Sequence, residues 1–65
     1  MKKYQAIIKD ISKQTKLTQV QLGQLVWPDD KSSLTQARIA KYETGRATPP
    51  GDVLLRIINI GEQFK

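Results

Sequence analysis

The side chains that stand out as able to do chemistry in this chain are cationic groups and carboxamides. Its 65 residues include no Cys and no His, and its six Asp and Glu form no recognisable pair or cluster. This composition removes thiolate nucleophiles, imidazole bases and the usual zinc ligands together. We therefore expect no enzyme, no metal, no cofactor and no small-molecule ligand.

The charge balance favours a polyanionic partner. Eleven Lys and Arg against six Asp and Glu give a formal net charge of +5. In so small a chain this balance favours phosphate contacts and counterion release. The alternative is that the Lys side chains only solvate helix surfaces, and charge alone does not separate the two. No apolar run approaches the length of a membrane span, so we expect no membrane contact and a cytoplasmic location.

Helices are the elements expected to position these groups. Apolar residues at i, i+3, i+4 and i+7 predict a first helix over about 3–15. A second helix is expected to begin at Thr18, which matches a capping box with Gln21. It should end at Trp27, because the residue before a proline is pushed out of helical geometry. The stripe on the first helix consists of Tyr4, Ile7, Ile8 and Ile11.

The interior of the second helix indicates how it packs. Leu17 and Leu22 are spaced to form a hydrophobic staple around the cap. Leu22, Leu25 and Val26 are expected to form its buried face. Gly23 costs about 1 kcal/mol relative to Ala in mid-helix. We therefore expect that its missing side chain lets another helix come close.

The start of the third helix has two candidate registers. In one, Ser33 and Gln36 form a capping box. In the other, Thr35 is the cap, and Leu34 and Ile39 form a staple across it. We prefer the second register because it anchors both apolar side chains.

The ends of the third and fourth helices are marked by glycines and prolines. Gly45 suits the left-handed cap of the third helix. Pro50 suits the first position of a fourth helix that runs to Gly61. The fourth helix is apolar around much of its circumference, which favours a subunit contact.

Two stretches of this chain resemble the phage-repressor, Cro-like (XRE-type) family. Residues 17–23 read Leu-Thr-Gln-Val-Gln-Leu-Gly, and 35–45 read Thr-Gln-Ala-Arg-Ile-Ala-Lys-Tyr-Glu-Thr-Gly. The family shows L-T-Q-x-x-L-A before its turn and S-Q-x-x-I-S-x-[YW]-E-x-G after it. The resemblance continues over 46–60. It implies one all-α, lambda-repressor-like helix-turn-helix domain over 1–65, with four helices or five, and 35–44 as the recognition helix.

The resemblance also implies which side chains would read bases. Gln36 would bond a base edge, since a carboxamide fits adenine N6 and N7 together. Ala37 would offer only van der Waals contact, for example to a thymine methyl group. Lys41, about one turn further, would reach guanine O6 and N7. The structural alternatives are a local cap bond for Gln36 and a solvated surface side chain for Lys41.

A second set would contact the DNA backbone by the same resemblance. Gln19 would bond a phosphate and brace the first residue of the recognition helix, although it could also be a plain exposed first-turn residue. Glu43 would brace the core without touching DNA. Arg46 could instead be only a loop charge. The phosphate set is Gln19, Thr35, Arg38, Arg46 and Thr48.

The chain departs from the family pattern in two places. Residues 28–33 look like an insertion into a turn that is usually about three or four residues long. Because Asp29 and Asp30 repel phosphate, we expect this loop to project away from DNA or to contact protein. Only four residues follow Gly61, where family members often continue into a fifth helix, so we expect the apolar dimer contacts at Ile60 and Phe64.

Together these features predict a sequence-specific regulator of transcription that binds double-stranded DNA. A Cro-like repressor fits best, bound to a palindromic operator as a homodimer in a bacterial or phage-infected cell. The alternative is an antitoxin-like protein-interaction module that also binds DNA. The apolar fourth helix and the long turn favour that alternative.

Overall fold

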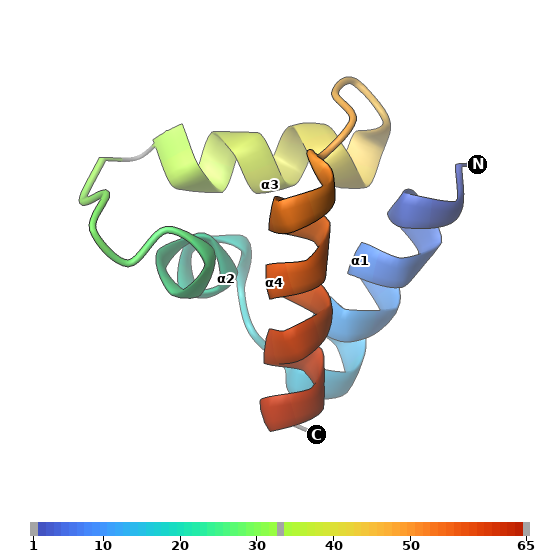
Figure 1. Cartoon of the computed structure of the whole chain (residues 1–65), viewed down its shortest axis with the longest axis horizontal. Helices are drawn as coiled ribbons and strands as arrows, with labels where there is room; N and C mark the ends of the chain where they lie inside the picture. Colours follow the sequence, from blue (N-terminus) through green and yellow to red (C-terminus); the bar gives the residue numbers. More distant parts are fainter. Residues whose placement is uncertain (1, 33, 65) are drawn as a thin grey trace.

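A computed structural model describes residues 2–32 and 34–64, and this part of the chain contains four α-helices and no strand. They are α1 (Lys3–Thr15), α2 (Gln19–Val26), α3 (Leu34–Thr44) and α4 (Gly51–Gln63). The all-α class is confirmed, with four helices and not five in the described residues. Figure 1 shows α3 lying across one end of α4, with α1 beside α4 and α2 under α3. None of these helices is long and apolar enough to cross a bilayer.

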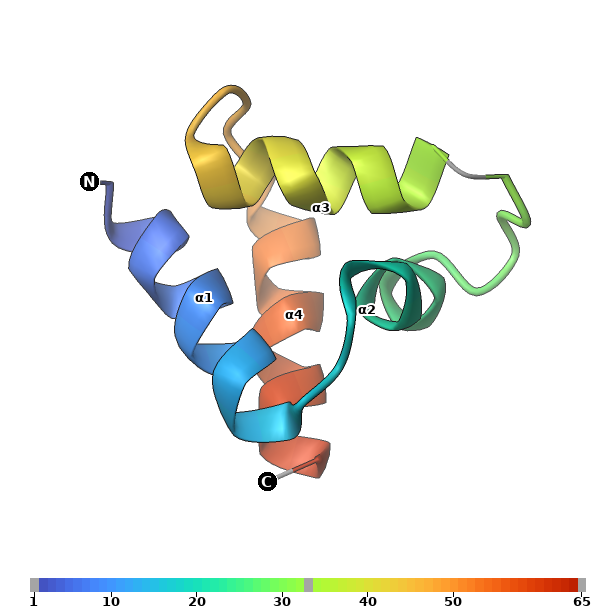
Figure 2. The ribbon, with the colours of Figure 1, turned by 180° about the vertical axis from the view of Figure 1, so that it is seen from behind.

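The buried side chains form one cluster drawn from all four helices. In that cluster α2 packs against α3 and α4, and α1 packs against α3 and α4. Seen from behind, α1, α3 and α4 surround the same centre (Figure 2). The cluster consists of Ile8, Ile11, Leu22, Val26, Ile39, Tyr42, Val53, Ile57 and Ile60.

Three apolar residues lie differently from the sequence expectation. Ile60 is buried in the core, so the expectation that it forms a dimer contact is wrong. Leu25 was expected on the buried face of α2, but its side chain is 41% exposed. Ile7 lies at the exposed edge of the α1 stripe. Ile60 belongs instead to the core cluster that all four helices form.

The capping box of α2 is confirmed. The Gln21 backbone N–H donates to Thr18 Oγ1 at 3.1 Å, and the Thr18 N–H donates to Gln21 Oε1 at 2.9 Å. These two bonds satisfy donors that the first turn of a helix otherwise leaves unpaired. Trp27 leaves helical geometry (φ −125°, ψ 74°), as expected before Pro28.

Gly23 allows the close approach of α2 and α3. A Cβ at this position would lie 3.0 Å from the carbonyl carbon and from the Cβ of Thr35. The expected packing role of this glycine is therefore confirmed. Gly45 adopts φ +79°, the left-handed conformation expected where α3 ends.

The preferred register for the start of α3 is wrong. The helix already includes Leu34, so Thr35 is inside the first turn and does not cap it. Thr35 donates from its hydroxyl to the Ser32 carbonyl at 3.3 Å and packs over Gly23. Leu34 is 59% exposed and forms no staple with Ile39. The competing cap at Ser33 lies outside the described residues.

Candidate nucleic-acid interface

The outer face of α3 is an open surface. Gln36, Ala37 and Lys41 are all exposed, whereas Ile39 on the opposite side is fully buried. A shallow hollow of about 320 Å³ follows this face of the helix. Its lining is Ala37, Ala40, Lys41, Thr44 and Arg46. The structure therefore brings two of the proposed base readers and one proposed phosphate contact to one surface.

Ala40 and Thr44 are surface residues that sequence reasoning missed. They follow Ala37 at helical spacing, since i+3 and i+4 neighbours share a face. That spacing was the available signal. Thr44 donates from its hydroxyl to the carbonyl of Ala40 at 2.9 Å and lines the hollow.

A chain of polar contacts joins the start of α3 to α2 and α1. Gln36 Nε2 donates to Gln19 Oε1 at 3.4 Å. Gln19 Nε2 donates to Glu43 Oε2 at 3.0 Å, and Ser12 Oγ donates to Glu43 Oε1 at 3.1 Å. Glu43 thus braces three helices from within, which is the role that the resemblance implies for it.

These contacts orient Gln19 and Gln36 without using up their capacity. Each carboxamide has two N–H donors and an oxygen with two lone pairs. The contact at 3.4 Å is near the outer limit for a hydrogen bond, so it is weak. Gln36 keeps its oxygen and a second N–H, and Gln19 keeps a second N–H, for further hydrogen bonds.

The connector after α3 is held to the end of that helix. The Gly45 N–H donates to the Tyr42 carbonyl at 3.3 Å, and the Arg46 N–H donates to the Lys41 carbonyl at 2.9 Å. This pair of bonds is the Schellman arrangement, in which a glycine turns the chain out of a helix. The backbone of Arg46 is therefore fixed beside the hollow, and Thr48 lies exposed two residues further on.

Thr35 does not fit the phosphate set. Its side chain is only 2% exposed, because it occupies the space over Gly23. The expectation that its hydroxyl contacts a phosphate is wrong for this reason.

No protein-family model, curated protein or solved structure matches this chain. The likeness to the phage-repressor family therefore depends on the residues quoted above.

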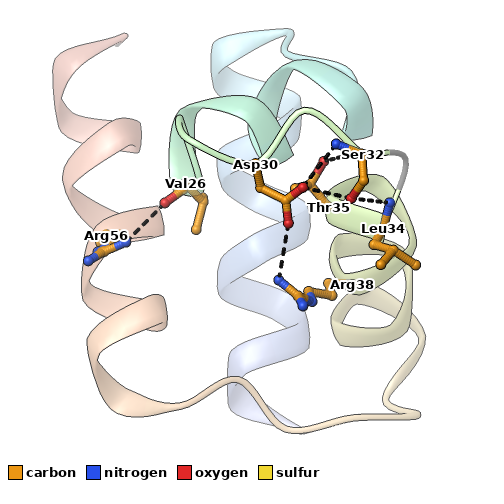
Figure 3. Close-up of polar contacts among 7 residues, drawn as sticks. All are labelled: Val26, Asp30, Ser32, Leu34, Thr35, Arg38 and Arg56. Atoms are coloured by element: carbon orange, nitrogen blue, oxygen red, sulfur yellow. Dashed lines mark hydrogen bonds and ion pairs between the residues drawn. The ribbon is translucent and has the colours of Figure 1, made fainter.

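Arg38 lies at the edge of the outer face and points toward the turn between α2 and α3 (Figure 3). Its Nη1 is 3.9 Å from Asp30 Oδ2, and its guanidinium lies 5.2 Å from the centre of the Trp27 ring. Asp30 thus ties the turn to α3 within the chain, and the expectation that the turn projects away from DNA or contacts another protein stays a prediction. Hydrogen bonds from the Ser32 hydroxyl and N–H, and then Arg38, hold the pKa of the Asp30 carboxyl below its usual value of 3.8.

The other end of the turn is tied to α4. Arg56 Nη1 donates to the Val26 carbonyl at 3.1 Å, which satisfies a carbonyl at the end of α2 (Figure 3). Sequence reasoning gave Arg56 no role, because its partner is thirty residues away in the chain. Within residues 2–32 and 34–64, no group of three or more acidic side chains is placed to hold a metal ion.

Proposed function

We propose that this chain is a sequence-specific regulator of transcription that binds double-stranded DNA, of the Cro-like repressor kind. The observation that carries the proposal is the brace from Gln36 through Gln19 to Glu43, which presents the first turn of α3 beside an open outer face. A helix of this kind enters the major groove with its N-terminal residues on base edges. A net charge of +5 supports the approach to a polyanion.

In this account three side chains of α3 read the bases. Gln36 bonds adenine N6 and N7, Lys41 bonds guanine O6 and N7, and Ala37 packs against a thymine methyl group. Gln19, Arg46 and Thr48 contact phosphates on either side and fix the position of the helix in the groove.

The proposed palindromic operator requires two copies of the chain. Leu25 and Phe64 are 41% and 44% exposed, and both line a hollow of about 250 Å³ together with Leu17, Gln21 and Gln24. Large apolar side chains gathered at one exposed site favour a protein contact. We assign the homodimer contact to this hollow, with Phe64 retained from the sequence expectation and Leu25 in place of Ile60.

The alternative function is an antitoxin-like module, in which the same hollow holds a different protein. The two functions differ in what the purified chain does alone. A homodimer that binds duplex DNA without any other protein supports the repressor. A monomer that binds duplex DNA only weakly supports the alternative.

The reading face is tested by comparing matched substitutions on α3 and α1. Gln36→Ala and Lys41→Ala should each change the preferred base at one position, with a loss of about 1–3 kcal/mol at the preferred site. Gln14→Ala and Lys9→Ala remove the same groups from exposed positions on α1. These controls should leave the base preference unchanged. The assignment fails if the α3 variants also keep the wild-type preference.

A further inference from the structure

The inserted turn presents one carboxylate in a fixed orientation. Asp30 Oδ1 accepts from the Ser32 N–H at 2.9 Å and from the Ser32 hydroxyl at 2.7 Å. Both donors use the same oxygen. The second oxygen, Oδ2, is left facing the guanidinium of Arg38 at 3.9 Å (Figure 3).

The guanidinium of Arg38 is held from a second side by an aromatic ring. It lies 5.2 Å from the centre of the Trp27 ring, within the range of a cation–π contact. The Trp27 ring in turn packs at 6.4 Å from the ring of Tyr42, which belongs to the core. Arg38 is therefore directed toward the turn by a ring anchored in the fold and by an oriented anion.

The place of Arg38 on α3 makes this contact important for DNA. Arg38 precedes Lys41 by three residues, so the two are neighbours on the helix surface. A free guanidinium at this edge of the recognition helix is well suited to donate two parallel hydrogen bonds to two oxygens of one backbone phosphate. Its side chain is 47% exposed and that of Asp30 is 33% exposed, so solvent and phosphate can reach the pair.

We propose that Asp30 competes with DNA phosphate for Arg38, and that the inserted turn thereby lowers the affinity of the chain for DNA. The inference rests on the proposed function. Asp30 takes the guanidinium that would otherwise neutralise one phosphate, and its own charge repels the backbone. An exposed ion pair of this kind is weak, so a phosphate can displace the Asp30 carboxylate from Arg38 at little cost in free energy.

The test is a salt titration of binding to one duplex with Asp30→Asn, Arg38→Gln and the double variant. Asn keeps an oxygen that accepts from Ser32, so the turn is retained while the charge is lost. Asp29→Asn is the matched control, because it removes the same charge from the exposed neighbouring residue. The probe is a duplex of about 20 base pairs. It carries either the site that the wild type selects from random duplexes or a random sequence, and binding is measured by fluorescence anisotropy.

We expect Asp30→Asn to tighten binding by about three- to tenfold at low salt and to steepen the slope of log K against log salt by about 0.9. Asp29→Asn should tighten binding less and leave the slope unchanged. In the Arg38→Gln background, Asp30→Asn should no longer steepen the slope. The proposal is overturned if both Asn variants behave alike, if the steeper slope persists without Arg38, or if Asp30→Asn weakens binding.

A double-mutant cycle of thermal unfolding on the wild type, Asp30→Asn, Arg38→Gln and the double variant distinguishes a failure of this inference from a failure of the proposed function. It shows whether Asp30 and Arg38 interact in the free protein, and whether each variant is folded. If the pair couples in unfolding but no folded variant binds duplex at any salt, the proposed function fails and this inference fails with it. If all variants bind with equal affinity and equal slope, the inference alone fails.

Discussion

Glu43 shows how much one side chain contributes to holding α3 in place. Its two carboxylate oxygens accept from Ser12 on α1 and from Gln19 on α2, while its own backbone lies on α3. Its backbone carbonyl also accepts from Gln5 Nε2 at 3.2 Å. Three helices therefore meet at one residue that does not itself face the outer surface of α3.

We predict that Glu43→Ala lowers the free energy of unfolding by about 1–3 kcal/mol, because two hydrogen bonds to a charged acceptor are lost. Glu43→Gln keeps one acceptor oxygen and should lose less. Denaturant unfolding followed by circular dichroism gives both values. Equal stability of the wild type and Glu43→Ala would show that the brace contributes nothing.

Asp30 should give stability a dependence on acidic pH. Its folded pKa lies below its ordinary value of 3.8, because the carboxylate accepts from Ser32 and faces Arg38. A group of this kind stabilises the fold above its unfolded pKa and loses that contribution as the pH falls through the folded pKa. Asp30 lines a hollow of about 400 Å³ beside Trp27, and the other charged side chains around this hollow are Asp29, Lys31 and Arg56.

We therefore expect the wild type to have a higher Tm than Asp30→Asn above about pH 5, and the difference to shrink as the pH falls below 3.8. Thermal unfolding of both proteins over a pH series measures this. Asp29→Asn is the control, because it shows how far Tm changes when one negative charge is lost at the neighbouring residue. A difference between wild type and Asp30→Asn that stays constant down to the lowest pH would contradict the assignment.

At the residue scale, sequence reasoning placed side chains correctly where the signal was local. The cap at Thr18 is the example, since its partner Gln21 lies three residues away. The bracing role of Glu43 came from the family resemblance, because its partners Ser12 and Gln19 are distant in the chain. Thr35 and Ile60 were misplaced because their burial is decided by other elements. Thr35 fills the space over Gly23, and Ile60 fills the core between helices that are distant in the chain.

At the scale of elements, the contact between α2 and α3 depends on a residue without a side chain. A Cβ on Gly23 would lie 3.0 Å from the carbonyl carbon of Thr35, so the start of α3 would have to move away from α2. The effect would reach Gln36, the next residue along α3. Gly51, in contrast, has nothing within 4 Å of the equivalent position.

We predict that Gly23→Ala lowers the free energy of unfolding by about 1 kcal/mol, because overpacking costs about 1–3 kcal/mol and the gain in helix propensity recovers about 1 kcal/mol. Gly51→Ala should be neutral or stabilising. Denaturant unfolding of the two variants gives the comparison. A Gly23→Ala protein more stable than the wild type would show that the two helices do not meet as described.

The helix ends were predictable to different degrees. The end of α2 at Trp27 and the left-handed turn at Gly45 follow from proline and glycine geometry, and both were expected. The start of α3 was misjudged because two capping patterns overlap within four residues. Packing of Thr35 over Gly23 overturned the register capped by Thr35, and that contact joins residues twelve positions apart.

At the scale of the whole molecule, the proposed homodimer would use the hollow that Leu25 and Phe64 line. We predict that Phe64→Ser raises the dissociation constant of the homodimer by at least about tenfold, since one buried Phe contributes about 1.5–3 kcal/mol. Leu55→Ser is the control, because Leu55 is also exposed on α4 but lies outside the hollow. Sedimentation equilibrium measures both. If Leu55→Ser weakens the dimer and Phe64→Ser does not, the interface lies on another face.

The most direct test of the central claim is the selection of bound sites from a pool of random duplexes, with the wild type and Gln36→Ala in parallel. We predict that the wild type enriches a two-fold symmetric site whose half-sites lie about one helical turn, roughly 10 base pairs, apart. Gln36→Ala should lose the preference for one base pair in each half-site and keep the rest. A wild-type pool without any enriched sequence, or an identical site for both proteins, would contradict the account.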